Sequence, residues 1–171
     1  MTAGELSRVE VWQAKLLCCR YLFAQFEVAS VQGEGVSGCP DDSTVAWAVG
    51  QLRDGTYEPL GAWPISAIGS PLWDAVVDDL AARGLERIEH LTVHKTCQSV
   101  LGGPAVLTRL GPLAGIPPRL RGKARKFDSV TADLRAAVNR IVARRSRANP
   151  KGTALCLANL LMRTESATRK L

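Results

Sequence analysis

The alternation of hydrophobic and polar residues between positions 44 and 94 predicts two strands, a helix and a further strand, in that order. Residues 44–50 and 57–63 form two short apolar runs, and the first is rich in valine, alanine and tryptophan. The pair Asp54-Gly55 lies between them, and these residues tolerate the positive φ angles that a tight hairpin turn requires. We therefore expect the two runs to pair as antiparallel strands.

The segment after this hairpin has the spacing of an amphipathic helix. Ser70 is a suitable N-cap, Pro71 fits the first helical position, and Gly84 is a typical residue to end the helix. Residues 88–93 then return as a strand, so we expect the helix to be a crossover connection between neighbouring strands. The hydrophobic positions that share one helix face are Leu72, Trp73, Val76, Val77, Leu80 and Ala81.

The residues before the hairpin add a helix and a strand. Residues 2–19 show loose helical periodicity, with Trp12 and Leu16 among the apolar positions. Residues 20–31 are aromatic and β-branched with partial alternation, which is typical of a strand.

The C-terminal part of the chain is predicted to be helical after an irregular connector. Residues 98–127 are rich in proline, glycine and basic residues, so we expect a solvated connector without long regular elements. A helix capped by Asp128 or Ser129 follows, and a final leucine-rich helix comes after a turn at 149–152. The whole pattern predicts a single α/β domain over residues 1–171, in which residues 128–171 form a basic helical part.

Composition restricts the class of protein. The chain has 171 residues, of which 46% are hydrophobic, and its apolar runs are too short to cross a bilayer. We expect a cytoplasmic protein without a membrane partner. The five cysteines include no Cys-x-x-Cys pair, which argues against a disulfide framework and a zinc ribbon. Cys18 and Cys19 are interpreted as packing residues.

The charges are distributed unevenly along the chain. Residues 1–100 contain 7 Lys or Arg and 13 Asp or Glu, whereas residues 101–171 contain 15 and 3. A concentrated basic segment is what binding to a polyanion requires, because each neutralised phosphate releases condensed counterions. The alternative is a basic surface that only keeps the chain soluble, or a poorly ordered tail.

Several short motifs occur in an order that is typical of one protein family. They are Tyr21-Leu22-Phe23, Ala48-Val49-Gly50, Asp54-Gly55, Glu58, Leu60-Gly61, Trp73, Asp79-Leu80, Arg83-Gly84-Leu85, and Asn139-Arg140 followed by Arg144-Arg145-Ser146-Arg147. This combination resembles the catalytic core of the Mutator-type insertion-sequence transposases of bacteria. The resemblance implies an RNase H-like mixed sheet, with an antiparallel meander, a crossover helix, a further strand and basic C-terminal helices.

The same resemblance implies that three metal-binding acids are replaced. The positions that match the family's two catalytic Asp residues and its Glu hold Gln25, His94 and Ala136. Family members cleave DNA with two Mg²⁺ ions held by carboxylates, and neither an amide nor an imidazole nor a methyl group substitutes well. Mg²⁺ is therefore expected only if the site were intact. Three other acids could stand in for the missing ones: Glu27, Asp128 and Asp133.

One further metal site deserves consideration. His90, His94 and Cys97 lie close together in sequence, and the two histidines share a strand face. A structural zinc site requires four ligands, and no fourth candidate lies nearby in sequence. We therefore favour ordinary polar roles for these residues and expect no metal or other cofactor.

The sequence thus predicts a transposase-like DNA-binding protein without strand-cleavage activity. The alternatives are a repurposed, non-catalytic regulatory or protein-interaction domain, and a decayed gene product of marginal stability. The expected partners are DNA and possible further copies of the chain or a full-length transposase. The residues expected to contact phosphates are Arg140, Arg144, Arg145 and Arg147, with a second patch at Arg119, Arg121, Lys123, Arg125 and Lys126.

Overall fold

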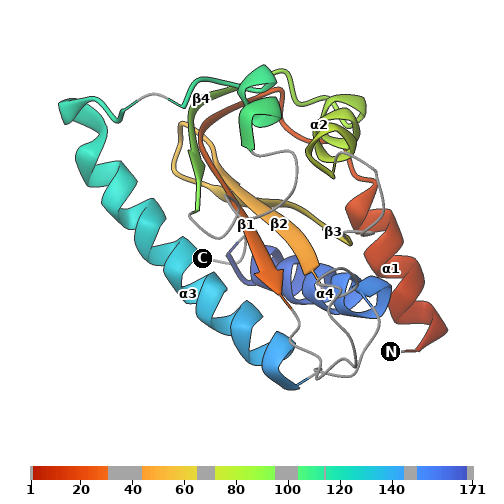
Figure 1. Cartoon of the computed structure of the whole chain (residues 1–171). Helices are drawn as coiled ribbons and strands as arrows, with labels where there is room; N and C mark the ends of the chain where they lie inside the picture. The colour runs from red at the N-terminus through yellow and green to blue at the C-terminus, as the bar shows by residue number, and fades with distance from the viewer. Residues whose placement is uncertain are drawn as a thin grey trace, which may run out of the picture.

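A four-stranded mixed sheet forms the centre of the molecule. The computed structural model describes residues 2–30, 44–64, 72–94, 104–113, 115–144 and 150–168. The strands are β1 (Arg20–Ser30), β2 (Thr44–Gln51), β3 (Tyr57–Pro64) and β4 (Arg87–Val93), in the order β3-β2-β1-β4 (Figure 1). The first three strands pair antiparallel, and β4 is parallel to β1. The predicted α/β class and all four predicted strands are confirmed, with boundaries that differ by at most one residue.

The turn between β2 and β3 has the geometry that its sequence predicts. Gly55 has a φ of 96°, which residues with a Cβ rarely adopt. The carboxylate of Asp54 accepts a hydrogen bond from the backbone N–H of Thr56 at 2.8 Å and so closes the turn.

The crossover helix does not connect neighbouring strands, so this prediction is wrong. Helix α2 (Leu72–Ala82) leads from β3 at one edge of the sheet to β4 at the other edge. Residues 21–29 of β1 are all buried, and the strand needs a hydrogen-bonding partner on each side. Strand β4 provides the second partner. Local hydrophobic patterns specify a strand but not the edge that it joins.

Residues 110–112 cover the outer edge of β4. The backbone N–H of Ile88 donates to the carbonyl of Leu110 at 2.7 Å, and that of Leu91 donates to Pro112 at 3.2 Å. A Cβ atom on Gly111 would lie 2.0 Å from the carbonyl oxygen of Ile88, so only glycine permits this close approach. The stretch protects an edge that could otherwise pair with another chain.

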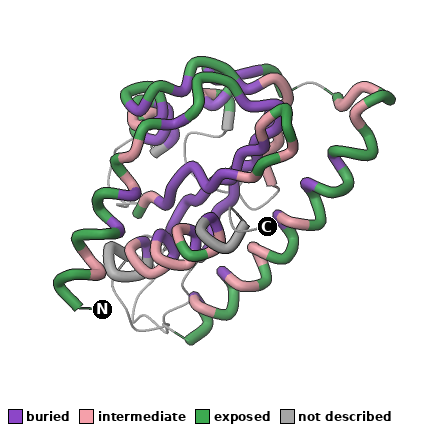
Figure 2. The backbone as a smooth tube through the Cα atoms, turned by 180° about the vertical axis from the view of Figure 1, so that it is seen from behind, coloured by how far each residue is buried: buried purple, intermediate pink, exposed green. Residues whose placement is uncertain are grey.

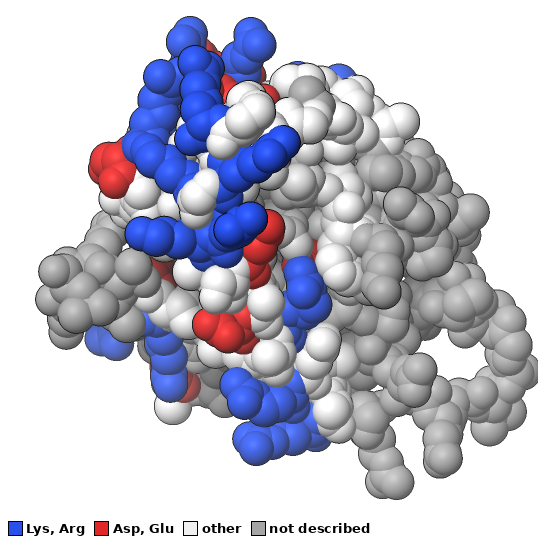
Figure 3. All heavy atoms as spheres, turned by 90° about the vertical axis from the view of Figure 1, so that its left-hand side faces the viewer, with Lys and Arg blue, Asp and Glu red and all other residues white. Residues whose placement is uncertain are grey.

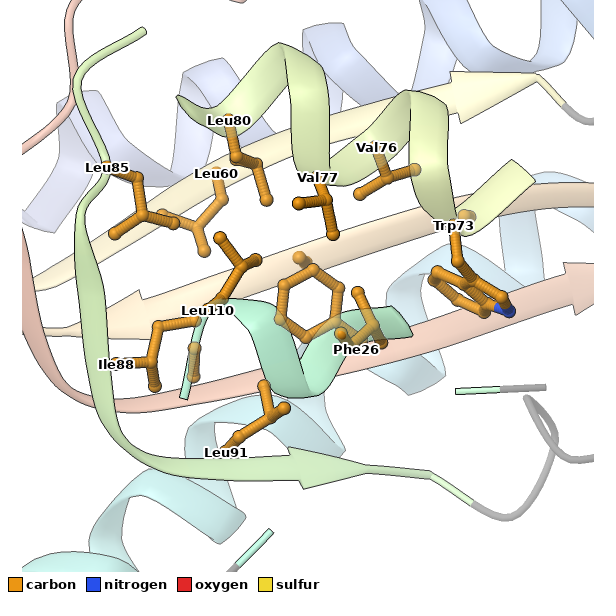
Figure 4. Packing of buried hydrophobic residues seen from close by; sticks show 14 of the residues in the cluster. Phe26, Leu60, Trp73, Val76, Val77, Leu80, Leu85, Ile88, Leu91 and Leu110 are labelled. Carbon is orange, nitrogen blue, oxygen red and sulfur yellow. The ribbon is translucent and has the colours of Figure 1, made fainter. Parts of the chain in front are cut away.

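Helices cover both faces of the sheet. Helix α2 and the short helix η2 (Pro104–Arg109) lie on one face, while α1 (Ala3–Gln13), α3 (Arg121–Arg144) and α4 (Pro150–Thr168) lie on the other. The α2 face packs Trp73, Val76, Val77 and Leu80 against Phe26 and its neighbours (Figure 4). These are four of the six helix positions predicted to face the sheet. Ala81 is exposed, and the side chain of Leu72 lies outside the described residues, as do Ser70 and Pro71.

Helix α1 is shorter than predicted. It begins with a capping box between Thr2 and Glu5 and ends at Gln13 rather than near residue 19. The chain then crosses from one core to the other, because Trp12 packs among the residues facing α3 and α4, whereas Leu17 packs on the α2 side. Leu16 is consequently 80% exposed.

The structure also corrects the prediction that Cys18 and Cys19 are packing residues. Both are exposed free thiols. They follow Leu17 at the point where the chain leaves α1 for β1, so neither side chain reaches a core.

The C-terminal helices begin earlier than predicted. Residues 121–126 form the first turns of α3 and are not part of a connector. Apart from Gly122 these residues are good helix formers, and Ala124 is buried against the sheet. Helix α4 likewise begins at Pro150, within the predicted turn, and proline is favoured at the first position of a helix. None of the helices among the described residues is both long and apolar enough to span a membrane.

Candidate nucleic-acid interface

Helix α3 has one buried side and one exposed side. Its buried residues are Ala124, Phe127, Thr131, Val138 and Val142, which recur at helical spacing. Figure 2 shows that the central strands β1 and β2 are buried almost throughout, whereas α3 is buried only at intervals along the side that faces the sheet. The ring of Phe127 stacks on Phe23 and Tyr57, with centroid distances of 5.7 and 6.2 Å. These contacts fix which side of α3 faces water.

The exposed side of α3 has basic residues near both of its ends. We call Arg121, Lys123, Arg125 and Lys126 the first cluster, and Arg140 and Arg144 the second cluster; all six are exposed. Arg119 is also exposed and lies in the short helix η3 (Pro118–Leu120) just before α3. Figure 3 shows Lys and Arg gathered over the upper part of this face and again lower down, with acidic residues between them. Arg145 and Arg147 lie outside the described residues.

The β2–β3 turn contributes a basic residue that the sequence did not single out. The Lys123 ammonium donates to the backbone carbonyl of Arg53 at 3.0 Å, which places the turn beside the first cluster. Arg53 is 78% exposed and pairs with Glu89. A lone Arg in a hairpin turn gives no local signal of this proximity, because the contact joins residues 70 positions apart.

The middle of α3 is acidic on its exposed side. Asp128 and Asp133 are both exposed and lie between the two clusters. The only basic residue between them and the second cluster, Arg135, is directed to the sheet by Glu27. A polyanion that approaches α3 therefore meets positive charge at each end and negative charge at the centre.

Gln25, the first position that the resemblance equates with a catalytic acid, belongs to a hydrogen-bonded chain instead. The amide of Gln25 donates to a carboxylate oxygen of Glu27 at 2.6 Å, and its oxygen accepts from the Thr131 hydroxyl at 3.2 Å. The guanidinium of Arg135 binds both oxygens of Glu27, at 2.7 and 2.5 Å. Gln25 and Glu27 are only 7% and 2% exposed. The hydrogen bonds to Glu27 raise the pKa of Arg135 above its usual value.

His94 and Ala136 do not complete a metal site. His94 directly follows β4, and its backbone N–H donates to the carbonyl of Phe26 at 3.0 Å. It is thus close in register to Gln25, which pairs with Thr92. Ala136 is exposed on α3 and offers no ligand atom. The three positions therefore do not fit a pair of Mg²⁺ ions.

The stand-in acids also fail to converge. Glu27 is engaged by Arg135 beneath α3, whereas Asp128 and Asp133 are exposed. Within the described ranges no three His, Cys, Asp or Glu side chains are placed to hold one metal ion.

The histidine-based metal site gains no support either. The ring of His90 packs against Phe23 with a centroid distance of 5.6 Å, and its Nδ1 is buried without a hydrogen-bond partner. Cys97 lies outside the described residues.

Other motif residues that resemble the transposases have structural roles here. Glu58 accepts hydrogen bonds from the Tyr21 hydroxyl at 2.5 Å and the Lys15 ammonium at 2.8 Å. Burial and this hydrogen bond raise the pKa of Tyr21. The Lys15 ammonium also binds Glu165 of α4, which accepts from the Trp12 indole at 2.6 Å. The network joins α1, β1, β3 and α4.

Arg83 and Asp79 hold α2 to the sheet. The buried Arg83 guanidinium donates to the carbonyl of Leu60 at 2.6 Å, to that of Lys15 at 3.0 Å and to Asp79 at 3.2 Å. Asp79 also accepts from the Trp63 indole at 3.0 Å. These residues therefore have a physical reason to be present that does not depend on catalysis.

A cavity of about 490 Å³ lies between α1, β3 and α4. Its polar lining includes Gln13 and Asp79, which already bind the Ala62 backbone and the Trp63 indole, and the other walls are mainly apolar. The described lining contains no nucleophile with a base beside it, so we assign no reaction to this cavity.

No protein-family model matches the sequence, and no curated protein matches it either. The function of the chain is therefore inferred from its own geometry and charge.

Proposed function

We propose that this protein is a transposase-like DNA-binding protein that binds the phosphate backbone through the exposed side of α3 and does not cleave DNA strands. The observation that carries the proposal is the exposure of all six residues of the two basic clusters on α3. Six such residues exceed the few phosphate contacts that give measurable salt-dependent binding.

The order of the strands supports an RNase H-like fold. Three antiparallel strands in chain order are followed by a helix, and the fourth strand joins the far edge of the sheet parallel to β1. This is the arrangement of meander, crossover helix and further strand that the sequence motifs imply. Helix α3 follows and packs on the face of the sheet that carries Gln25.

The residues at these positions support the proposed loss of cleavage. Two-metal catalysis needs several carboxylates that face a common point with their oxygens free for metal ions. Here the carboxylate of Glu27 is bound at both oxygens by Arg135, Ala136 has no ligand atom, and Gln25 offers only an amide. We therefore assign α3 a binding role only.

Such binding would depend on charge rather than on base sequence. Lys and Arg side chains that contact phosphates position a duplex but do not distinguish its bases. We accordingly expect affinities that differ little between duplexes of equal length and different sequence.

Fluorescence anisotropy with a labelled 18-base-pair duplex across a salt series tests the proposal. About four or more phosphate contacts would give a slope of log affinity against log salt of about −3.6 or steeper. Incubation of the complex with Mg²⁺ or Mn²⁺ should leave the duplex intact. Absence of binding at about 50 mM salt would refute DNA binding, and the basic residues of α3 would then be a surface for an acidic protein. Metal-dependent nicking would refute the loss of cleavage.

A further inference from the structure

From the spacing of charges along α3 we infer that the two basic clusters contact the same DNA duplex at two separate places, so that the preferred ligand is a rigid duplex of about nine base pairs or more. This inference rests on the proposed DNA binding. It specifies the form and minimum length of the ligand, which the proposed function leaves open.

The distance between the clusters follows from helix geometry. Helix α3 contains 24 residues without a break, so it is about 36 Å long at 1.5 Å per residue. The centres of the two clusters are separated by about 28 Å along the helix axis. A B-form strand advances 3.4 Å per base pair, so this separation corresponds to about eight base-pair steps.

The clusters are also connected by one line along the helix, which passes through Lys126 of the first cluster and the residues of the second. Lys126 and Arg144 are 18 residues apart, which is five full turns at 3.6 residues per turn, so their Cβ atoms have the same direction around the axis. Arg140 is one turn before Arg144 and projects from nearly the same line. One straight ligand can therefore meet both clusters.

The residues between the clusters favour contact at the two ends only. Asp128 and Asp133 are exposed there, and Arg135 is occupied by Glu27, so no unpaired cation faces the ligand between residues 127 and 139 of this described helix. A backbone that followed this line of α3 over its whole length would bring phosphates against the carboxylate of Asp133, which lies seven residues, or about two turns, from both Lys126 and Arg140. A duplex avoids this repulsion where one of its grooves, rather than a backbone, faces the middle of α3.

A flexible single strand fits this arrangement less well. It must lose conformational freedom to place phosphates about 28 Å apart, whereas a duplex shorter than its persistence length already holds them at fixed positions. The first cluster alone should suffice for short ligands, and the contact of Lys123 places the β2–β3 turn beside it.

Binding of GC-rich duplexes of 6, 9, 12 and 18 base pairs, each closed at one end by a hexaethylene glycol linker and measured at 5 °C, tests the inference. The variant Arg140→Ala/Arg144→Ala removes the second cluster and keeps good helix formers. We expect this variant to lose on the order of tenfold in affinity for 12 and 18 base pairs and less than twofold for 6. Its salt slope on 18 base pairs should fall by about 1.8, which corresponds to two phosphate contacts.

The matched control is Arg8→Ala/Arg163→Ala, which removes the same charge from exposed positions on α1 and α4. It should keep at least half of the wild-type affinity at every length. An equal loss for Arg140→Ala/Arg144→Ala on 6 and 18 base pairs, or no loss on any length, would overturn two-point contact while leaving DNA binding intact. If the wild-type protein bound none of the duplexes, the proposed function would fail as well.

Discussion

Arg135 of α3 binds both carboxylate oxygens of Glu27 on β1, across 108 positions of sequence. The carboxylate is almost completely buried, so its charge depends on this partner and on the amide of Gln25. The pair therefore fixes the rotation of α3 on the sheet and, with it, which residues of α3 face water.

Loss of the arginine should destabilise the fold. Arg135→Ala leaves the buried Glu27 charge without its cation. Because the Arg135 side chain is itself 29% exposed, we expect a loss of about 2–3 kcal/mol in the free energy of unfolding, below the upper range for fully buried pairs. Urea unfolding measures this value.

Two further variants separate the ion pair from other effects. Arg140→Ala, on the exposed side of the same helix, should change stability by less than about 0.5 kcal/mol. The double variant Glu27→Gln/Arg135→Met should be more stable than Arg135→Ala alone, because it leaves no unpaired charge. Equal stability of Arg135→Ala and the wild type would contradict a stabilising pair.

The hydroxyl of Tyr21 should make stability depend on alkaline pH. Its pKa in the folded protein is raised above the ordinary value of 10.0, so the folded state keeps a proton that the unfolded state releases. The stabilisation is complete below pH 10 and is lost as pH rises above it. Between pH 8 and 11 the wild type should lose about 1.4 kcal/mol more than Tyr21→Phe. Parallel slopes for the two proteins in urea unfolding would argue against a raised pKa.

The close approach of Gly111 to β4 predicts that alanine at this position destabilises the fold far more than alanine at Gly115. A methyl group at position 111 would collide with the carbonyl of Ile88, whereas nothing lies within 4 Å of the same group at Gly115. We expect Gly111→Ala to cost about 2 kcal/mol or more and Gly115→Ala to be nearly neutral. Thermal unfolding of the two variants provides the comparison. Similar melting temperatures would mean that residues 110–112 do not cover the edge of β4.

The acidic middle of α3 should weaken DNA binding. Asp128→Asn/Asp133→Asn removes two exposed negative charges without changing the size of the side chains. We expect the affinity for an 18-base-pair duplex to rise about threefold at low salt, and the difference to shrink at high salt as screening increases. Asp74→Asn/Asp78→Asn on α2 is a suitable control, since it removes equal charge from the opposite face of the sheet. An unchanged affinity for the α3 variant would indicate that the middle of α3 lies far from the duplex.

The sequence predicted the strands well because their signals are local. Residues 57–63 and 88–93 are bounded by turn residues, and Asp54-Gly55 fits a single kind of turn. The beginning of α3 was missed since its basic residues were assigned to a solvated connector, although Ala124 and Phe127 already follow the helical spacing of Thr131. The spacing of these three residues at every third or fourth position was the usable sequence signal for the helix.

Relationships between distant residues were beyond such local signals. The edge that β4 joins depends on competition among strands, and the pairing of Glu27 with Arg135 depends on how α3 is rotated. The sequence identified Glu27 only as a possible metal ligand. A buried glutamate looks the same in a sequence whether its carboxylate pairs with an arginine or binds a metal ion. Arg140, Arg144 and the described residues of the first cluster are exposed, but their contact with DNA stays a prediction.

The hydrogen bond between Trp12 and Glu165 affects how the chain folds during its synthesis on the ribosome. The indole and the neighbouring Lys15 are synthesised before their shared partner, which is added 150 or more residues later. Until α4 emerges, one face of the sheet lacks a large part of its cover and exposes apolar side chains to water. At typical rates of synthesis this interval lasts on the order of ten seconds. Nascent chains of this protein should therefore expose this face of the sheet until α4 has left the ribosome.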